Sequence, residues 1–292
     1  MAANGDAVQA AVTGISQADF LRFRDFFYRK TGIYFEESKR YFVDKRLLQR
    51  INATGQATFR NYFTQLRFQA SQAELQALIN LLTVNETYFF REEYQFRCMV
   101  RSVLPELVKR RGAQHALRIW SVPCSSGEEA YSIALYLLEY WPPIDDVDVE
   151  IVASDIDSRI LEQAQRGVYS QRAVQHLPAA VLHRHFTQQA ADRYQLNRDL
   201  RESVAFTQVN IADPLQTRRY RGYDLIFCRN LLIYFDDASR RQAAEALFDA
   251  LEPGGFMFLG HSESMSRISS LFNVRKFPEA IAYQRPLSEG RS

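Results

Sequence analysis

The sequence predicts an α/β fold with a mostly parallel sheet, which carries a small inserted antiparallel subdomain and follows an all-helical domain. The beginning of the chain shows only helical periodicity, whereas from about residue 118 short apolar strands alternate with amphipathic helices. Such strands form parallel sheets that helices cover on both faces. Polar residues follow the predicted strands, at the edge where these sheets bind ligands. These observations place a ligand site in the second part of the chain.

The first 84 residues divide into a flexible start and a helical domain. Residues 1–14 are rich in small and polar residues, and we expect them to be flexible. Residues 15–84 form the predicted helical domain, in which Ser16 is placed to cap the first helix. The apolar positions of that helix are Phe20, Phe23, Phe26 and Phe27. Three further helices are predicted at 37–51, 58–66 and 72–82.

The remaining residues are predicted to form a connecting segment and the α/β domain. Residues 85–117 are expected to contain a linker and a helix that completes the ligand site, and residues 118–292 the sheet domain. Helices are predicted at 128–139, 156–166 and 238–251, between strands at 118–122, 149–154, 204–209, 224–228 and 255–260. At about 170–203, Pro178 and scattered charges break this pattern, which indicates a helical piece followed by a short antiparallel hairpin.

The composition excludes several classes of protein. The chain has 292 residues, 47% of them hydrophobic, and a net charge of +2 that gives no general affinity for nucleic acid. The three cysteines lie far apart, and the five histidines have no partner at metal-ligand spacing. We therefore expect neither a disulfide framework nor a metal site. Without a signal peptide or an apolar run of ~18 residues, the protein is expected to be cytoplasmic and not inserted in a membrane.

Acidic and amide residues follow the second and third predicted strands. Asp155 is placed to accept hydrogen bonds from both hydroxyl groups of a ribose. Asp157 is the better candidate to cap the next helix, although either aspartate suits that position. Asn210 can pair with the edge of a base through its donor and acceptor together. The Asn-x-x-Asp-Pro pattern that begins at Asn210 is, by itself, more often a loop.

Further polar residues follow the fourth predicted strand and precede the sheet domain. Arg229 and Asn230 are expected at the mouth of the site, and Tyr234 is either a ligand group or a core tyrosine with a bonded hydroxyl. The segment 83–92 places Asn85, Thr87 and Arg91 beside aromatic residues, where the two domains join. The alternative for this segment is a helix cap at Thr87 followed by two buried phenylalanines.

Several stretches resemble the CheR-type chemoreceptor methyltransferases in order and spacing: NETYFFRE, CSSGEEAYSIA, ASDID with ILEQAQRGVY, VNIADP, FCRNLLIYF and LEPGGFMFLGHSES. The resemblance covers about residues 20–283. It implies a Rossmann-like, S-adenosylmethionine-dependent methyltransferase domain that leaves S-adenosylhomocysteine as product. It also implies a substrate: glutamate γ-carboxylates on the cytoplasmic coiled coil of chemoreceptors, methylated for sensory adaptation in chemotaxis or in pilus or surface sensing.

The resemblance implies a role for particular residues. Cofactor contacts are implied for Asn85, Thr87, Arg91, Glu128, Asp155, Asn210, Ile211, Arg229 and Asn230. Arg91 and Tyr234 match the positions assigned to methyl transfer and substrate placement. Ala130 replaces a proline of the family pattern, and Pro123 stands where a small residue is common. Neither change removes a ligand group.

The turn from Cys124 to Glu129 fits this cofactor better than a dinucleotide. It holds one glycine where a pyrophosphate-binding turn needs three, and its two glutamates would repel phosphate. S-adenosylmethionine carries an ammonium and a sulfonium instead. We expect Gly127 to permit close backbone approach, Glu128 to suit the cationic ligand, and Glu129 to serve the helix N-terminus.

The implied reaction needs positioning and no general base. A glutamate carboxylate has an unperturbed pKa of ~4.3 and is ionised at neutral pH. Arg91 can hold the incoming carboxylate with its planar guanidinium, and the Tyr234 hydroxyl can direct the second oxygen. Holding the reacting atoms in line contributes up to ~7–11 kcal/mol in ideal cases.

Two surface features concern the receptor. Lys39, Arg46 and Arg50 recur along the second predicted helix and are expected to dock the acidic coiled coil, the alternative being a solvated basic face. Family members that bind a receptor C-terminal pentapeptide have a glycine-containing turn in the inserted hairpin. Residues 186–204 contain no glycine, so we expect no such tether.

Two other functions compete with this prediction. A non-catalytic, cofactor-binding regulator of receptors would lack Arg91 or Tyr234, and both are present. A methyltransferase acting on a small molecule or nucleic acid would not need the basic helix. An amino-methylating DNA enzyme would carry an Asn/Asp-Pro-Pro-Tyr/Phe loop, whereas this chain has only Asn230-Leu-Leu-Ile-Tyr234.

Overall fold

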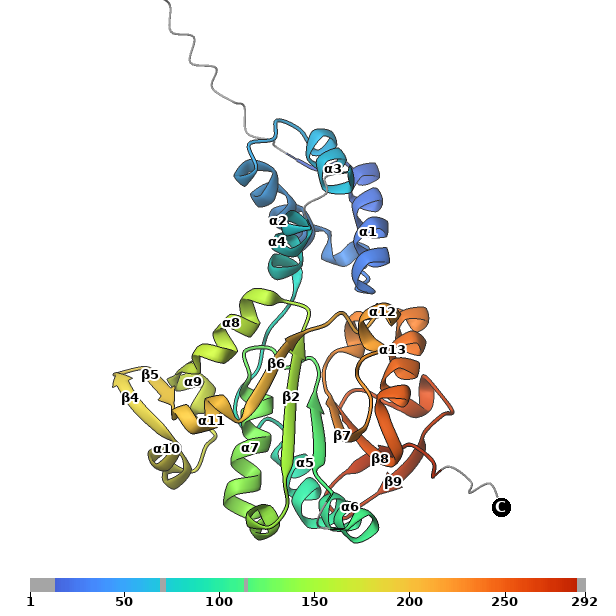
Figure 1. Ribbon diagram of the computed structural model, residues 1–292. Helices are drawn as coiled ribbons and strands as arrows, with labels where there is room; N and C mark the ends of the chain where they lie inside the picture. Colours follow the sequence, from blue (N-terminus) through green and yellow to red (C-terminus); the bar gives the residue numbers. More distant parts are fainter. Residues whose placement is uncertain (1–13, 69–71, 113–114, 288–292) are drawn as a thin grey trace, which may run out of the picture. The chain divides into compact units, whose positions relative to one another are not determined.

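The computed structural model describes residues 14–68, 72–112 and 115–287, and it divides the chain into two compact units, Met1–Thr83 and Val84–Ser292 (Figure 1). Residues 1–13 of the segment predicted to be flexible lie outside the described residues.

The first unit is all-helical, as predicted. It contains α1 (Gln17–Thr31), the 3₁₀ turn η1 (Glu37–Lys39), α2 (Arg40–Ala53), α3 (Phe59–Phe68) and α4 (Ala73–Leu82). The Ser16 side chain accepts a hydrogen bond from the Asp19 N–H and caps α1, which confirms the predicted cap. The four phenylalanines predicted to face inward from α1 are all buried.

The second unit is built on a seven-stranded sheet with the order β6-β2-β1-β7-β8-β10-β9. The first five strands in this order are parallel, and β10 and β9 are antiparallel. The strands are β1 (Leu117–Ser121), β2 (Val149–Asp155), β6 (Val204–Gln208), β7 (Tyr223–Cys228), β8 (Leu251–Leu259), β9 (Asn273–Lys276) and β10 (Ile281–Gln284). Every residue of β7 is buried, as expected of a central strand that other elements cover on both faces.

Helices flank this sheet (Figure 1). A continuous helical stretch precedes it, composed of α5 (Glu93–Cys98), the π-helical turn η2 (Met99–Val103) and α6 (Leu104–Arg111). The helices and helical turns that follow are α7 (Glu128–Tyr140), η3 (Pro142–Asp145), α8 (Ser158–Arg166), α11 (Arg198–Glu202), α12 (Pro214–Thr217), η4 (Leu232–Tyr234), α13 (Asp237–Ala250) and η5 (Met265–Arg267).

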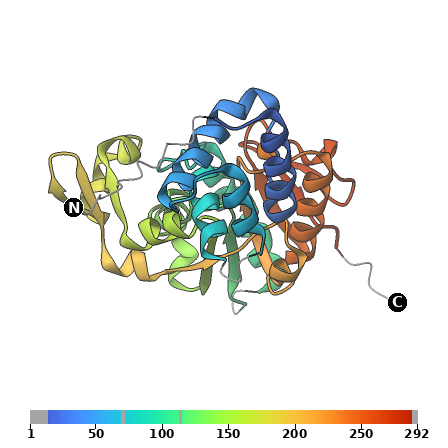
Figure 2. The same ribbon diagram turned by 90° about the horizontal axis from the view of Figure 1, so that it is seen from above.

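A three-stranded antiparallel sheet, β3-β5-β4, forms the inserted subdomain. It comprises β3 (Val168–Ser170), α9 (Gln171–Val174), α10 (Ala179–His185), β4 (Phe186–Ala190) and β5 (Arg193–Leu196). Figures 1 and 2 place it on the opposite side of the second unit from α13. The predicted helical piece and hairpin are present, and β3 is an additional strand.

The predicted strands and helices of the main sheet agree with the structure except at its β8 side. β8 begins at Leu251, which the sequence had placed in a helix, and β9 and β10 were not predicted. Both strands have only four residues. They form because β10 pairs with β8 and β9 pairs with β10, and these are contacts that local periodicity does not contain.

Candidate functional site

The carboxyl ends of β1 and β7 define the site, because these adjacent strands lie where the strand order of the sheet reverses. Two cavities near this edge share Thr87, Tyr88 and Arg91 as lining residues. The first is also lined by Phe96, Pro123, Cys124, Ser125, Glu129, Arg229 and Asn230. The second has a volume of about 340 Å³ and is also lined by Asn85, Glu86, Ser170, Arg172, Ala173 and Gln175. Arg91 therefore borders both.

The backbone around Arg91 is held in an unusual conformation. Its neighbours Phe90 and Glu92 have φ angles of 59° and 56°, a left-handed region that costs of order 1–3 kcal/mol for a residue other than glycine. The Phe90 N–H donates to Ser132 Oγ at 3.0 Å. Phe89 and Phe90 are buried, as the alternative interpretation of this segment required, but Thr87 caps no helix, because α5 begins at Glu93.

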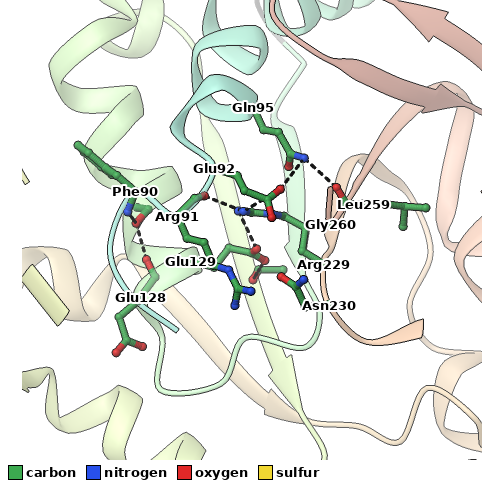
Figure 3. A network of polar contacts seen from close by, with 12 residues as sticks. Phe90, Arg91, Glu92, Gln95, Glu128, Glu129, Arg229, Asn230, Leu259 and Gly260 are labelled. Carbon is green, nitrogen blue, oxygen red and sulfur yellow. Dashed lines mark hydrogen bonds and ion pairs between the residues drawn. The ribbon is translucent and has the colours of Figure 1, made fainter. Parts of the chain in front are cut away.

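A buried ion-pair network around Arg229 holds the turn that contains Arg91 (Figure 3). The Arg229 side chain is 2% exposed, with Nη1 lying 3.2 Å from Glu129 and Nη2 lying 3.3 Å from Glu92. Nη2 also donates to the Arg91 carbonyl at 2.6 Å. Both terminal nitrogens of Arg229 thus bind protein groups, and the guanidinium that was predicted to contact cofactor fixes the backbone of Arg91 while it lines the first cavity.

Glu129 lies in the first turn of α7, as expected, and it also binds groups outside this helix. Its carboxylate accepts from Ser121 Oγ at 2.7 Å and pairs with Arg229. Burial raises the pKa of Glu129, and the charge of Arg229 opposes that rise. This ion pair could not be predicted from the turn alone, because Arg229 lies in the distant loop that follows β7.

Glu128 points away from this network, although it is the next residue (Figure 3). Its side chain accepts from Ser126 Oγ at 2.6 Å, and the residue is 4% exposed. Burial raises the pKa of Glu128 to about 7. A group that binds its ionised form therefore has to displace a proton near neutral pH.

Asp155 and Asp157 have different roles at the end of β2. The Asp155 carboxylate accepts from the backbone N–H groups of Ser125 and Asp157, at 2.8 and 2.9 Å, and burial raises its pKa to about 6. Asp157 caps α8 by accepting from the Ile160 N–H, which confirms its predicted role. Its second carboxylate oxygen accepts from Asn85 Nδ2 at 3.0 Å, so the predicted ligand residue Asn85 is tied to this strand end.

The packing of two helices requires Gly127, and its predicted role in ligand approach stays a prediction. It has a φ of 93°, and a Cβ at this position would lie 3.0 Å from Ala164 Cβ and 3.0 Å from the Tyr131 ring. The missing side chain therefore allows α7 and α8 to approach each other. This packing contact was not visible in the sequence.

Asn210 and Ile211 are buried after β6, and neither lines the two cavities. Asn210 Oδ1 accepts from the Ala212 N–H at 3.0 Å, and Asp213 caps α12, so the loop interpretation of this motif is confirmed. Their predicted contacts with cofactor stay predictions.

Asn230 and Tyr234 follow β7. Asn230 has a φ of 59° and lines the first cavity. Tyr234 is half-buried, and its hydroxyl has no hydrogen-bond partner among the described residues, unlike a core tyrosine with a bonded hydroxyl. Burial raises the pKa of Tyr234, the charges of Glu86 and Glu263 raise it further, and that of Arg91 lowers it.

The predicted docking residues of α2 differ in how they are held within the first unit. Lys39 is exposed. Arg46 lies over the Phe42 ring and donates to the Leu81 carbonyl at 2.6 Å. Arg50 makes two hydrogen bonds to Glu74, at 2.9 and 2.6 Å, so both arginines stabilise the helical unit.

The polar groups around the first cavity fit a cofactor with hydroxyl and cationic groups. Ser125 Oγ is buried without a partner among the described residues and belongs to the cavity wall. The buried carboxylates of Asp155 and Glu128 stand in the same turn region, where they would disfavour phosphate. Among residues 14–68, 72–112 and 115–287, no cluster of side chains suits a metal ion. In the same described part of the chain, no helix has the length and apolarity needed to cross a membrane.

Comparison with known proteins identifies the family of this chain. Residues 85–281 match the family described as "CheR methyltransferase, SAM binding domain", and residues 18–83 match "CheR methyltransferase, all-alpha domain". Chemotaxis protein methyltransferase 2 of Vibrio cholerae is 57% identical, covering 93% of this chain and 94% of its own length. Chemotaxis protein methyltransferase 2 of Pseudomonas aeruginosa is 38% identical, with coverages of 88% and 90%. Chemotaxis protein methyltransferase of Escherichia coli is 33% identical, with coverages of 89% and 89%. The chain belongs to the CheR methyltransferase family, and its second unit carries the family's S-adenosylmethionine-binding domain.

Proposed function

We propose that this protein transfers the methyl group of S-adenosylmethionine to the γ-carboxylate of glutamates in the cytoplasmic coiled coil of chemoreceptors. The observation that carries the proposal is the presence of Arg91 at both cavities of a CheR-family cofactor domain. The relatives named chemotaxis protein methyltransferases support the same receptor class. The products are glutamate methyl esters and S-adenosylhomocysteine, and the place of action is the cytoplasm.

Arg91 and Tyr234 position the acceptor in this proposal. S-adenosylmethionine supplies an electrophilic methyl group on a sulfonium. Arg91 holds the ionised carboxylate, since only one of its terminal nitrogens has a hydrogen-bond partner among the described residues, the Glu86 carbonyl at 2.9 Å. The hydroxyl of Tyr234, which has no hydrogen-bond partner in the described part of the chain, donates to the second carboxylate oxygen. One carboxylate oxygen forms the new C–O bond, the S–C electron pair goes to sulfur, and no proton is transferred.

The remaining residues hold the cofactor. Asp155 and Glu128 supply carboxylate acceptors, and Asn85, Thr87 and Asn230 supply neutral polar groups. Asn210 and Ile211 contact the nucleotide base of the cofactor. For this contact the Asn210 side chain has to leave its own turn or to bind through its amide nitrogen. Arg229 acts through the Arg91 backbone. Binding assays of single alanine variants would test these assignments one by one.

The exposed charge of α2 is proposed to dock the receptor. Arg46 and Arg50 have internal partners, whereas Lys39, the last residue of η1, and Lys45 in α2 are exposed and have no ion-pair partner among the described residues. Tyr41 is 80% exposed between them. An acidic helix is complementary to this face, and each exposed contact contributes ~0.2–1 kcal/mol that salt screens.

Charge reversal tests the docking face. We expect Lys39→Glu with Lys45→Glu to raise the KM for receptor ~3- to 10-fold at low salt and less at high salt. The matched control is Lys109→Glu with Lys276→Glu, which makes the same change in net charge on exposed lysines of the second unit. Equal KM values for the two double variants would contradict the docking role.

We also propose that receptor binding does not use a C-terminal pentapeptide. The β4–β5 hairpin turns through Ala191 and Asp192 and contains no glycine. Receptor domains with and without the pentapeptide should therefore be methylated with the same KM.

Methyl labelling tests the function as a whole. Purified protein, radiolabelled S-adenosylmethionine and receptor cytoplasmic domains should give alkali-labile label that disappears when the acceptor glutamates are changed to alanine. Cofactor binding without transfer would favour a non-catalytic regulator. Label on nucleic acid or on small molecules would contradict the receptor substrate.

A further inference from the structure

Glu263 joins two loops of the site by accepting backbone hydrogen bonds from both. Its Oε1 accepts from the Leu232 N–H at 2.7 Å. Its Oε2 accepts from the N–H groups of Asn230 and Gly260, at 2.8 and 2.9 Å. Glu263 lies in the turn after β8, whereas Asn230 and Leu232 lie in the loop after β7. One side chain thus determines how these two strand ends approach each other.

The two loops are packed too closely to rearrange freely. A Cβ on Gly260 would lie 2.8 Å from Asn230 Nδ2 and 3.0 Å from the Asn230 nitrogen. Asn230 itself has a left-handed φ of 59°, which costs free energy in a residue other than glycine. The Glu263 carboxylate offsets this cost with charge-assisted hydrogen bonds, which are about twice as strong as neutral ones.

The groups that Glu263 holds lead directly to the site. Asn230 lines the first cavity together with Arg91. Leu232 is the first residue of η4 (Leu232–Tyr234), so the N–H group held by Oε1 fixes the start of the turn that carries Tyr234. The Tyr234 hydroxyl has no partner of its own among the described residues, and its position therefore depends on this turn.

We propose that Glu263 is a positioning residue for methyl transfer, which places Tyr234 through Leu232 and places Asn230 through its backbone. This inference rests on the proposed function. The motif Gly260-His-Ser-Glu263 had no role in the predicted site, and the structure assigns it one. The two oxygens of Glu263 have separable tasks, because Oε1 serves the η4 turn and Oε2 serves Asn230.

The isosteric variant Glu263→Gln separates these tasks. Its carbonyl oxygen can keep the bonds to Asn230 and Gly260, but its amide NH₂ then faces the Leu232 N–H, donor against donor. We expect kcat for receptor methylation to fall ~10- to 100-fold, as for a catalytic group displaced by about 1 Å. The Kd for S-adenosylmethionine should stay within about twofold, since the backbone of Asn230 is still held. Glu263→Ala loses both tasks and should also weaken cofactor binding.

A double-mutant cycle with Tyr234→Phe is the decisive test. If Glu263 acts through Tyr234, Glu263→Gln should lower kcat much less in the Tyr234→Phe background than in the wild type. Glu252→Gln is the matched control, because Glu252 lies in β8 and pairs with Arg111 at 2.8 Å, away from the two cavities. It should leave kcat unchanged. Melting temperatures and circular dichroism establish that each variant is folded at the assay temperature.

Two results would overturn the inference. One is an unchanged kcat in Glu263→Gln, and the other is a kcat loss that simply multiplies with that of Tyr234→Phe. An absence of receptor methylation by the wild type would instead contradict the proposed function. In that case the Kd for S-adenosylmethionine still tests whether Glu263 holds Asn230 in place. A wild-type Kd in Glu263→Ala would show that Glu263 does not position this part of the cavity wall.

Discussion

Cofactor binding should depend on pH through Glu128. This carboxyl is buried beside the turn after β1, and burial raises its pKa from 4.5 to about 7. A cationic or hydroxyl group of the cofactor favours the ionised form, so binding releases a proton. We therefore expect affinity for S-adenosylmethionine to increase with pH until Glu128 is ionised in the free protein.

The size of the effect follows from this pKa. With a value of about 7, roughly nine-tenths of Glu128 is ionised at pH 8 and roughly one-tenth at pH 6. Affinity should therefore fall about tenfold between these values. The folded state gains from the same group at low pH, because it binds the proton more tightly than the unfolded chain does. Its contribution to the free energy of unfolding is lost as pH rises from 4.5 to about 7, in total about 3 kcal/mol.

Isothermal titration calorimetry measures both the affinity for S-adenosylmethionine and the number of protons that binding releases. Kd values between pH 6 and 8 give the slope, and buffers with different ionisation enthalpies give the number of protons released. Glu128→Gln should bind weakly and lose most of the pH dependence in this window, because Asp155, with a pKa of about 6, contributes at most about twofold there. The same slope in Glu128→Gln and in the wild type would refute the reasoning, as would a wild type without proton release.

The remaining predictions concern Arg91, the ion pair between Arg229 and Glu129, and the turn before α7. Arg91→Lys should lower kcat/KM for the receptor ~10- to 100-fold, because an ammonium cannot replace the planar fork; near wild-type turnover in the labelling assay would exclude that role. Arg229→Met leaves Glu129 buried without its cation and should lower the free energy of unfolding by ~3–5 kcal/mol. In urea denaturation this deficit should grow from pH 5 to pH 8, since the carboxyl pKa rises further without Arg229; a deficit that is constant with pH would contradict it. Gly127→Ala should cost more stability than Gly55→Ala, because both have positive φ but only Gly127 is crowded. Equal losses of melting temperature would show that the backbone conformation alone accounts for the cost.

The helical unit and the parallel part of the sheet could be predicted because their signals are local. The buried face of α1 repeats with helical spacing, and β7 is an uninterrupted apolar run. Helix caps could also be predicted, as Ser16 and Asp157 show, since a cap joins residues that are only a few positions apart. The positions of candidate ligand residues followed from one rule, that parallel strands end at a common edge.

The partners of the charged residues could not be read in the same way. Arg229 carried a predicted ligand role, yet in the structure it pairs with Glu92 and Glu129 from two other segments. Arg46 and Arg50 were predicted to be surface charges that dock the receptor, whereas in the structure both bind residues of α4. A charge does not specify which opposite charge it meets, because that depends on how the chain brings distant segments together.

The sequence by itself determined the family, the two-part architecture and the residue types at the strand ends, because these depend on local patterns and on motif order. Only the tertiary structure decided what each polar group does. It separated Glu128, which is buried and hard to ionise, from Glu129, which is paired with Arg229, although the two are adjacent in the chain. It also gave Glu263 its place between the loops after β7 and β8. The physical reason is that hydrogen bonds and ion pairs act over a few ångströms in space, whatever the separation along the chain.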